Sequence, residues 1–246
     1  GSDPDFTVDT TTPDTTITAN PPLLTNSSNA SFSFTGNDSG GSGVASLQCQ
    51  LDGGAFSACT SPQSYFALGD GSHTFQVRAI DNAGNVDPTP ASYTWTVDTT
   101  APAAPVVTTP ANGSVTNDST PSVSGTAEPN STVTVYIDGS IAGTTTADGS
   151  GNWNFTAAAL SDGSHTVRAT STDAAGNTSP SSNTNTFTVD TTAPDTTITA
   201  NPADPTNSTT PSFSFTVSDP GGSGVASFQC QIDGGAFSAC TSPQSY

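Results

Sequence analysis

The chain has 246 residues and a net charge of −19, and its two arginines leave no basic surface for nucleic acid or anionic lipid. No apolar stretch approaches the roughly 20 residues of a membrane helix, so membrane insertion is not expected. With no lysine and only two histidines, the chain has few of the groups that hydrolytic enzymes use, and we expect no enzyme activity.

The chain is built from internal repeats. Residues 14–65 return 181 positions later as 195–246 without a gap, and a related unit lies between them. The phrase Thr-Val-Asp-Thr-Thr closes each unit, and its spacings of 89 and 92 residues are the size of a small β-sandwich domain. We therefore expect the last strand and linker of a preceding repeat at 1–12, repeats at 13–100 and 101–192, and an incomplete third repeat at 193–246.

Apolar and polar residues alternate in short runs, as in strands that bury one face. Phe32 and Phe34 alternate with serines, and Phe75 and Val77 alternate with polar residues further along. In the first repeat the pattern predicts seven strands, at 15–19, 30–36, 45–51, 55–60, 63–67, 73–81 and 91–98. No segment has a helical period. The expected fold is all-β, a linear array of tandem Ig-like Greek-key β-sandwiches.

Four cysteines form two repeat-equivalent pairs, Cys49 with Cys59 and Cys230 with Cys240. The first pair is symmetric about Gly54, so a hairpin with the loop 53–55 would place its cysteines opposite each other. We favour a disulfide in each repeat over buried free thiols or a metal site, because no histidine lies nearby to complete a zinc set. Disulfides indicate an oxidising, extracellular setting.

The remaining distinctive side chains have structural interpretations. His73 and His165 hold the same place in their repeats, and each is expected to cap a turn. Arg78 is expected on the outward face of its strand with a solvated or cross-strand partner. Trp95 alternates with other core-side residues, so packing is favoured over a role as a platform for carbohydrate.

Three motifs recur in both complete units: Val-Asp-Thr-Thr at the closing joint, Asp-Gly-Ser-His-Thr at 70–74 and 162–166, and Asp-x-Ala-Gly-Asn at 81–85 and 173–177. With these motifs the chain resembles the bacterial immunoglobulin-like repeats of large secreted and cell-surface adhesins. The second unit resembles the adhesin-type subgroup, and the first and third resemble a cysteine-bearing variant. The resemblance implies secretion or display on a bacterial cell surface.

Acidic residues are expected to gather at one pole of each repeat. If the strands are lettered A to G, the preceding linker and the B–C, D–E and F–G loops share that pole. Clustered carboxylates repel unless a cation intervenes, and Ca²⁺ takes six to eight oxygen ligands from such loops. The resemblance likewise implies Ca²⁺ at the junctions between repeats. The candidate ligands are Asp9, Asp14, Asp38 and Asp81 in the first repeat, Asp98, Glu128, Asp148 and Asp173 in the second, and Asp190, Asp195 and Asp219 in the third. Aspartate is also an ordinary turn residue, so the alternative is that these side chains only cap loops.

These observations lead us to expect a non-catalytic structural or stalk segment of a bacterial surface or adhesin-like protein, whose modules space or display a functional end. Its partners would be the neighbouring repeats. One alternative is a module that binds carbohydrate or protein through its loops. Another is a self-associating fibre subunit, assembled by strand complementation at the incomplete third repeat. The missing methionine indicates an internal fragment or a processed chain, and an arbitrary boundary at Tyr246 is a simpler explanation than an assembly edge.

Overall fold

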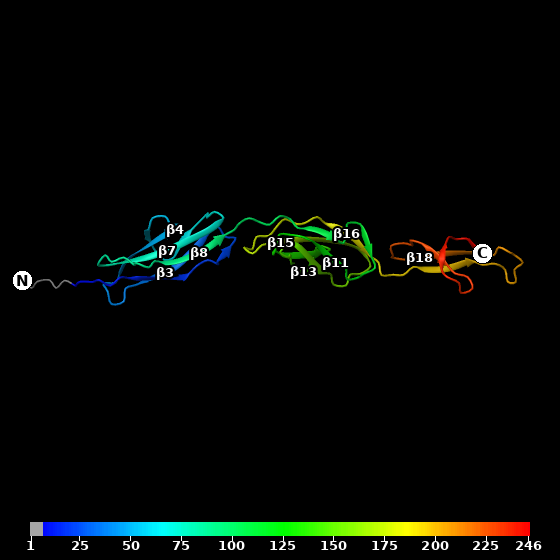
Figure 1. Ribbon diagram of the computed structural model, residues 1–246, viewed down its shortest axis with the longest axis horizontal. Coiled ribbons are helices and arrows are strands. Elements are labelled where there is room, and N and C mark those ends of the chain that lie inside the picture. The colour runs from blue at the N-terminus through cyan, green and yellow to red at the C-terminus, as the bar shows by residue number, and fades with distance from the viewer. Residues whose placement is uncertain (1–6) are drawn as a thin grey trace, which may run out of the picture. The chain divides into compact units, whose positions relative to one another are not determined.

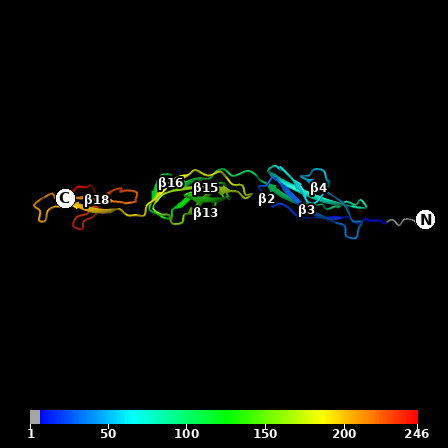
Figure 2. The ribbon, with the colours of Figure 1, turned by 180° about the vertical axis from the view of Figure 1, so that it is seen from behind.

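The computed structural model describes residues 7–246, which form β-strands joined by turns and loops (Figures 1 and 2). The chain divides into two compact units, one reaching to Pro102 and including Thr172–Thr178, the other formed by Ala103–Ser171 and Ser179–Tyr246. The repeat boundaries expected from the sequence remain predictions. Residues 7–12 carry no strand, and the rest of the expected preceding segment lies outside the described residues.

The first repeat is a sandwich of two sheets, with strand orders β1-β3-β6 and β2-β8-β7-β4-β5. Its strands are β1 (Asp14–Ala19), β2 (Leu24–Thr25), β3 (Ala30–Asn37), β4 (Val44–Leu51), β5 (Ser57–Cys59), β6 (Gln63–Tyr65), β7 (Gly71–Asp81) and β8 (Ala91–Val97). Each of the seven predicted strands is present. The sequence pattern did not predict β2, a two-residue strand that pairs in parallel with β8.

The core of the first repeat lies between its two sheets. The alternating apolar residues of β3, β7 and β8 point inward, and Phe32 stacks on Phe75 with ring centroids 4.1 Å apart. Trp95 is 1% exposed, so the packing interpretation is confirmed. On the outer face, the Arg78 guanidinium lies 4.0 Å from the centre of the Phe56 ring and donates to the Gln48 side chain on the neighbouring strand.

The cysteines of the first repeat form a disulfide, but their register differs from the predicted one. Cys49 faces Ser57, and Cys59 faces Leu47, so the two cysteines are not directly opposite. The reason is the turn: Asp52 and Gly53 both have positive φ and the Gly54 N–H donates to the Leu51 carbonyl, so the hairpin is centred on Gly53, one residue earlier than in the predicted loop 53–55, which was wrong. The Cα atoms are still 5.7 Å apart, within disulfide range, and Cys230–Cys240 has the same arrangement.

The second repeat is also a two-sheet sandwich, with orders β10-β16-β15-β12-β13 and β14-β11-β9. Its strands are β9 (Val106–Thr109), β10 (Ser114–Thr116), β11 (Ser122–Thr126), β12 (Thr132–Ile137), β13 (Ser140–Thr146), β14 (Asn152–Thr156), β15 (Gly163–Thr172) and β16 (Asn185–Val189). Its core includes Trp153 and Phe187 from opposite sheets. Within residues 7–246, no helix is long and apolar enough to cross a membrane.

The third repeat contains five strands, β17 (Asp195–Ala200), β18 (Ser212–Ser218), β19 (Phe228–Cys230), β20 (Ser238–Cys240) and β21 (Gln244–Ser245). Strands β17, β18 and β21 form one sheet, and β19 and β20 form the other. These strands correspond to β1 and β3–β6 of the first repeat. The described residues contain no counterpart of β7 or β8.

Each histidine locks a hairpin turn to the loop before its own strand. His73 Nδ1 lies 2.8 Å from the Asp52 carboxylate, and its Nε2 lies 2.8 Å from the Gly69 carbonyl. His165 makes the same two contacts, with Asp138 and the Ser161 carbonyl, at 2.7 and 2.8 Å. Both ring nitrogens therefore face acceptors, and only the doubly protonated imidazolium can donate to both.

These contacts raise the pKa of both histidines. For His73 the causes are the Gly69 carbonyl and then Asp52; for His165 burial opposes the charged form, but Asp138 and the Ser161 carbonyl outweigh it. A raised folded-state pKa adds stability that is complete below the unfolded pKa of about 6.5 and disappears as pH rises through the folded value.

We therefore predict that the melting temperatures of the first and second repeats fall between about pH 5.5 and pH 8.5. His73→Gln should cost the first repeat about 1–2 kcal/mol at the lower pH and flatten its pH profile, because a charged hydrogen bond is lost. Calorimetry across this range checks the prediction, with Ser72→Ala, at an exposed neighbour, as the control. A profile of His73→Gln parallel to that of the wild type would contradict it.

Candidate metal centre

Three aspartates from separate segments meet at one pole of the first repeat. Asp9 lies in the segment before β1, Asp38 follows β3, and Asp81 ends β7. One oxygen of each carboxylate lies within 4.8 Å of the others, the one such group of potential metal ligands in the part of the chain that the structure describes. Asp81 is 2% exposed, and the other two are half-buried. Asp14 stands apart, exposed at the start of β1.

The loop 38–43 wraps around the Asp38 carboxylate. Asp38 Oδ2 accepts a hydrogen bond from the Gly43 N–H at 2.8 Å, and Asp9 accepts one from the Ser42 N–H. Bonding from the Ser42 side chain, and then from the backbone N–H groups of Thr11 and Ser42, lowers the pKa of Asp9 and keeps it ionised. Asp81 accepts two bonds from Asn85, both at 2.7 Å.

One oxygen at this pole has no donor. Asp38 Oδ1 is buried and lacks any hydrogen-bond partner. A buried carboxylate oxygen normally finds a donor or a cation, because removing it from water otherwise costs free energy. The three carboxylates of this pole form an all-oxygen ligand set of the kind that hard divalent cations take. The residues present therefore fit a cation such as Ca²⁺.

The third repeat reproduces part of this arrangement. Asp190 accepts a hydrogen bond from the Ser223 N–H, and Asp219 Oδ2 accepts one from the Gly224 N–H at 2.8 Å. Asp219 Oδ1 is buried without a partner, as Asp38 Oδ1 is. Asp195 is exposed at the start of β17. The described residues hold no counterpart of Asp81 here.

The four candidates of the second repeat do not form such a group among the described residues. Asp148 accepts bonds from the N–H groups of Asn152 and then Ser150, which lower its pKa, and so acts as a cap of its own loop. Asp173 accepts bonds from the N–H groups of its own loop in the same way. Asp98 accepts a hydrogen bond from the Thr100 N–H, two residues further on. Glu128 is exposed. The turn-capping alternative describes these contacts.

The structure also shows a role that the sequence analysis missed. Asp70, the first residue of the Asp-Gly-Ser-His-Thr motif, accepts hydrogen bonds from the Thr99 N–H, the Thr99 hydroxyl and the Thr100 hydroxyl at 2.7–3.0 Å. The Thr99 hydroxyl is the main cause of its lowered pKa. Asp162 makes the same three bonds to Thr191 and Thr192. The joint recurrence of Asp-Gly-Ser-His and Val-Asp-Thr-Thr in both units was the available signal.

The same linkers are also held by asparagines of the Asp-x-Ala-Gly-Asn motif. Asn85 Nδ2 donates to the carbonyls of Asp9 and Thr11 at 3.1 and 3.2 Å. Asn177 Nδ2 donates to the Asp98 carbonyl at 2.7 Å. The motif aspartate orients each asparagine by accepting from the same Nδ2. The motifs that repeat along the sequence are therefore the ones that bind the linkers.

The comparison with known families agrees with these motifs. Residues 108–191 match the bacterial Ig-like domain family. The match confirms the expected resemblance and covers most of the second repeat. No curated protein matches the sequence.

Several solved structures are similar. Fibronectin(III)-like modules of CbhA from Clostridium thermocellum share 15% identity at a TM-score of 0.47, covering 71% of this chain and 93% of theirs. A tetra-tandem repeat from the extending region of a large adhesion protein shares 23% identity at a TM-score of 0.34, and the match covers 96% of this chain and 64% of that one. A structure from a 1.5-MDa bacterial ice-binding adhesin shares 20% identity at a TM-score of 0.31, and the match covers 82% of this chain and 71% of that one. This chain thus spans less than two thirds of the tetra-tandem structure.

We predict that Gly41→Ala disrupts the acidic pole. A Cβ at this position would lie 2.4 Å from both Asp38 carboxylate oxygens, so the carboxylate or the loop must move. The substitution should lower the free energy of unfolding of the first repeat by about 1–3 kcal/mol. Urea unfolding followed by hydrogen exchange of its peptides measures this effect.

Gly69→Ala is the matched control in the same repeat, because a Cβ there meets no atom within 4 Å. It should leave the stability of the repeat nearly unchanged. Equal stabilities of the two variants would show that the loop does not depend on the position of the Asp38 carboxylate.

Proposed function

We propose that this chain is a non-catalytic structural segment of a bacterial cell-surface or secreted adhesin-like protein, in which Ig-like modules space or display a functional end. The observation that carries the proposal is that the two complete repeats bind their linkers through equivalent aspartate and asparagine side chains. Asp70 and Asp162 hold the threonines that follow their own repeats, and Asn85 and Asn177 hold the linkers that precede theirs.

Such linkers suit a spacer, because a spacer depends on restricted motion at its joints. Free Gly/Ser-rich linkers behave as flexible coils, whereas here the N–H and the hydroxyl of Thr99 both donate to Asp70, and those of Thr191 both donate to Asp162. The proline that follows each Val-Asp-Thr-Thr phrase further restricts the backbone.

The histidines support the non-catalytic part of the proposal. Both ring nitrogens of His73 and of His165 are engaged by a carboxylate and a backbone carbonyl. These contacts favour the protonated ring, so neither side chain is suited to act as a general base. The adhesin repeats among the similar structures are consistent with the same kind of function.

A cation at the acidic pole of the cysteine-bearing repeats is the finer part of the proposal. Asp9, Asp38 and Asp81 would hold it in the first repeat, and Asp190 with Asp219 would contribute to it in the third. A bound Ca²⁺ would neutralise the clustered carboxylates and supply the partner that Asp38 Oδ1 lacks. Because Asp9 and Asp190 belong to linkers, binding would also tie each linker to the loop of the following repeat.

We predict that Ca²⁺ raises the melting temperature of the first repeat and leaves that of the second unchanged. Saturation at 100 times the dissociation constant would add about 2.7 kcal/mol. Calorimetric melts in excess EDTA and in added Ca²⁺ measure the effect. Asp38→Asn should abolish it, because the substitution removes the charge of the central ligand.

Asp14→Asn is the matched control, because it removes the same charge from an exposed aspartate outside the cluster. This variant should keep the full Ca²⁺ response. Superimposable wild-type melts in EDTA and Ca²⁺ would contradict the cation site but not the spacer, which rests on the linker bonds.

A further inference from the structure

The larger sheet of the second repeat carries no acidic residue. Its five strands, β10, β12, β13, β15 and β16, contain no aspartate or glutamate, although the chain has 21 acidic residues. Val133, Val135 and Val167 are buried in the core, so the threonines that alternate with them, such as Thr134 and Thr166, face outward. The outer face of this sheet is therefore an uncharged surface rich in hydroxyl groups.

A single arginine lies within this face. Arg168 belongs to β15, and its guanidinium lies 4.0 Å from the centre of the Tyr136 ring on the neighbouring strand β12. Ile141 of β13 faces Tyr136 in the strand register and is 67% exposed. Side chains that face each other across neighbouring strands lie on the same face of a sheet. The three residues therefore form a row across three strands, with a cation at one end and apolar surface at the other.

The Arg168 guanidinium keeps most of its donors available. A guanidinium has five N–H donors, and within residues 7–246 Arg168 uses one of its nitrogens, Nη1, to donate to the Ser181 hydroxyl at 3.0 Å. Arg78 of the first repeat also stacks on an aromatic ring, but its Nε and Nη2 both donate to Gln48 Oε1, at 2.9 and 2.8 Å. The side chain of Arg78 is thus bound by its own sheet, whereas that of Arg168 can receive a ligand.

The acidic residues of the repeat lie beyond the strand ends. Asp162 and Asp173 flank β15, six and five residues from Arg168, which is roughly 16–20 Å at about 3.3 Å per residue. The Debye length is about 8 Å at physiological ionic strength, so their charges are largely screened at Arg168. Asp138 lies closer along the sheet, but its carboxylate is paired with His165 at 2.7 Å. The negative charge of the chain therefore leaves Arg168 able to bind an anionic group.

The chemistry of this row fits a carboxylate carried on a saccharide. A guanidinium binds a carboxylate through two parallel hydrogen bonds, and threonine hydroxyls both donate and accept, as sugar hydroxyls do. Tyr136 and Ile141 offer apolar surface to the C–H groups of a sugar ring. A polymer with a charge on every unit, such as nucleic acid, would need several cations, and this face has one arginine. The carboxylates of the ligand should therefore be separated by neutral units.

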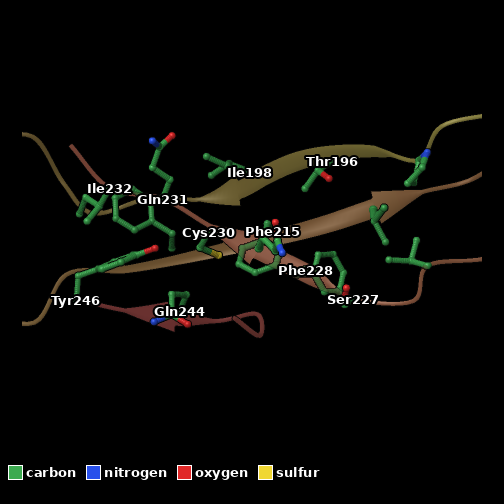
Figure 3. A pocket seen from close by; sticks show the side chains of 15 residues that line it. Thr196, Ile198, Phe215, Ser227, Phe228, Cys230, Gln231, Ile232, Gln244 and Tyr246 are labelled. Atoms are coloured by element: carbon green, nitrogen blue, oxygen red, sulfur yellow. The ribbon is translucent and has the colours of Figure 1, made fainter. Parts of the chain in front are cut away.

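The hollow in the third repeat does not offer this selectivity. Its lining, which includes Phe215 and Phe228, contains no charged side chain (Figure 3). The outer face of the second repeat is therefore the surface whose side chains specify a ligand.

We propose that the outer face of the second repeat binds an oligosaccharide in which carboxylated sugars alternate with neutral ones. Arg168 would bind a carboxylate, Tyr136 and Ile141 would contact the sugar rings, and the surrounding threonines would bond to sugar hydroxyls. This activity goes beyond the spacer role, because the repeat would attach to a glycan along its side. The spacer proposal rests on the linker bonds and does not depend on it.

The test titrates a hyaluronan hexasaccharide, in which glucuronate alternates with N-acetylglucosamine, into the full chain. Spectra of ¹⁵N-labelled protein should show saturable shifts at the amides of β12, β13 and β15 and at Arg168 Nε. Arg168→Gln should weaken binding at least about tenfold, because charge-assisted hydrogen bonds are lost. Arg78→Gln is the matched control, since it removes the same charge from the first repeat and should leave the affinity unchanged. Ile141→Ser alters an exposed side chain outside the core and should weaken binding about threefold.

Three results would overturn the proposal. The first is the absence of saturable shifts, or an affinity that Arg168→Gln leaves unchanged. The second is equal binding of the neutral hexamer of N-acetylglucosamine, which would mean that Arg168 does not select the ligand. The third is tighter binding of a hexaglutamate peptide at the same amides, which would identify an acidic peptide as the occupant. Calorimetric melts of each variant check that the second repeat stays folded, and the exposed Ile141→Ser variant tests the site without a change of charge.

Discussion

The structure depends on how a strongly acidic chain satisfies its carboxylates with very few basic side chains. Twenty-one acidic residues face only two arginines, so ion pairs cannot neutralise them. Backbone N–H groups and threonine hydroxyls take that role: Asp70, Asp148 and Asp162 each accept several such bonds. Hydrogen bonds to a charged acceptor are stronger than neutral ones, and short aspartate side chains reach only nearby donors. The carboxylates therefore order turns and linkers.

This constraint connects the fold to the proposed function. Where the aspartate stands beside a linker, as at Asp70 and Asp162, it accepts hydrogen bonds from the linker threonines, and the proposed spacer role rests on these bonds. Asp38 Oδ1 and Asp219 Oδ1 have no hydrogen-bond donor, and the proposed cation would supply the partner that each of them lacks. The histidines follow the same logic, since each ring lies between a carboxylate and a carbonyl, and these contacts favour its protonated form.

Much of the fold was predictable because strand alternation and turn residues are local signals. Phe32, Phe75 and Trp95 were placed in the core by periodicity alone, and the structure confirms them. The hairpin register was predicted wrongly, because the prediction relied on the symmetry of the two cysteines about Gly54. The register is set instead by a turn in which Asp52 and Gly53 have positive φ. Strand β2 was missed because two residues have no periodicity to detect.

The acidic pole was only partly predictable. Strand direction was enough to anticipate that Asp9, Asp38 and Asp81 share one end of the repeat. It did not separate them from Asp14, which follows the same linker but points to solvent, or from Asp148 and Asp173, whose bonds stay within their own loops. That distinction depends on loop conformation. The hydrogen bond from the Thr99 N–H to Asp70 joins residues 29 positions apart, and no local sequence pattern specifies it.

The central claim is that these aspartate bonds restrain the linkers. Its most direct test is ¹⁵N relaxation of the backbone amides of Thr99, Thr100, Thr191 and Thr192 in the full chain. We predict order parameters near those of the strands, about 0.85, with a fall at Thr99 and Thr100 alone in an Asp70→Ala variant. Values below about 0.6 in the wild-type chain would mean that the linkers move freely, and they would contradict the account.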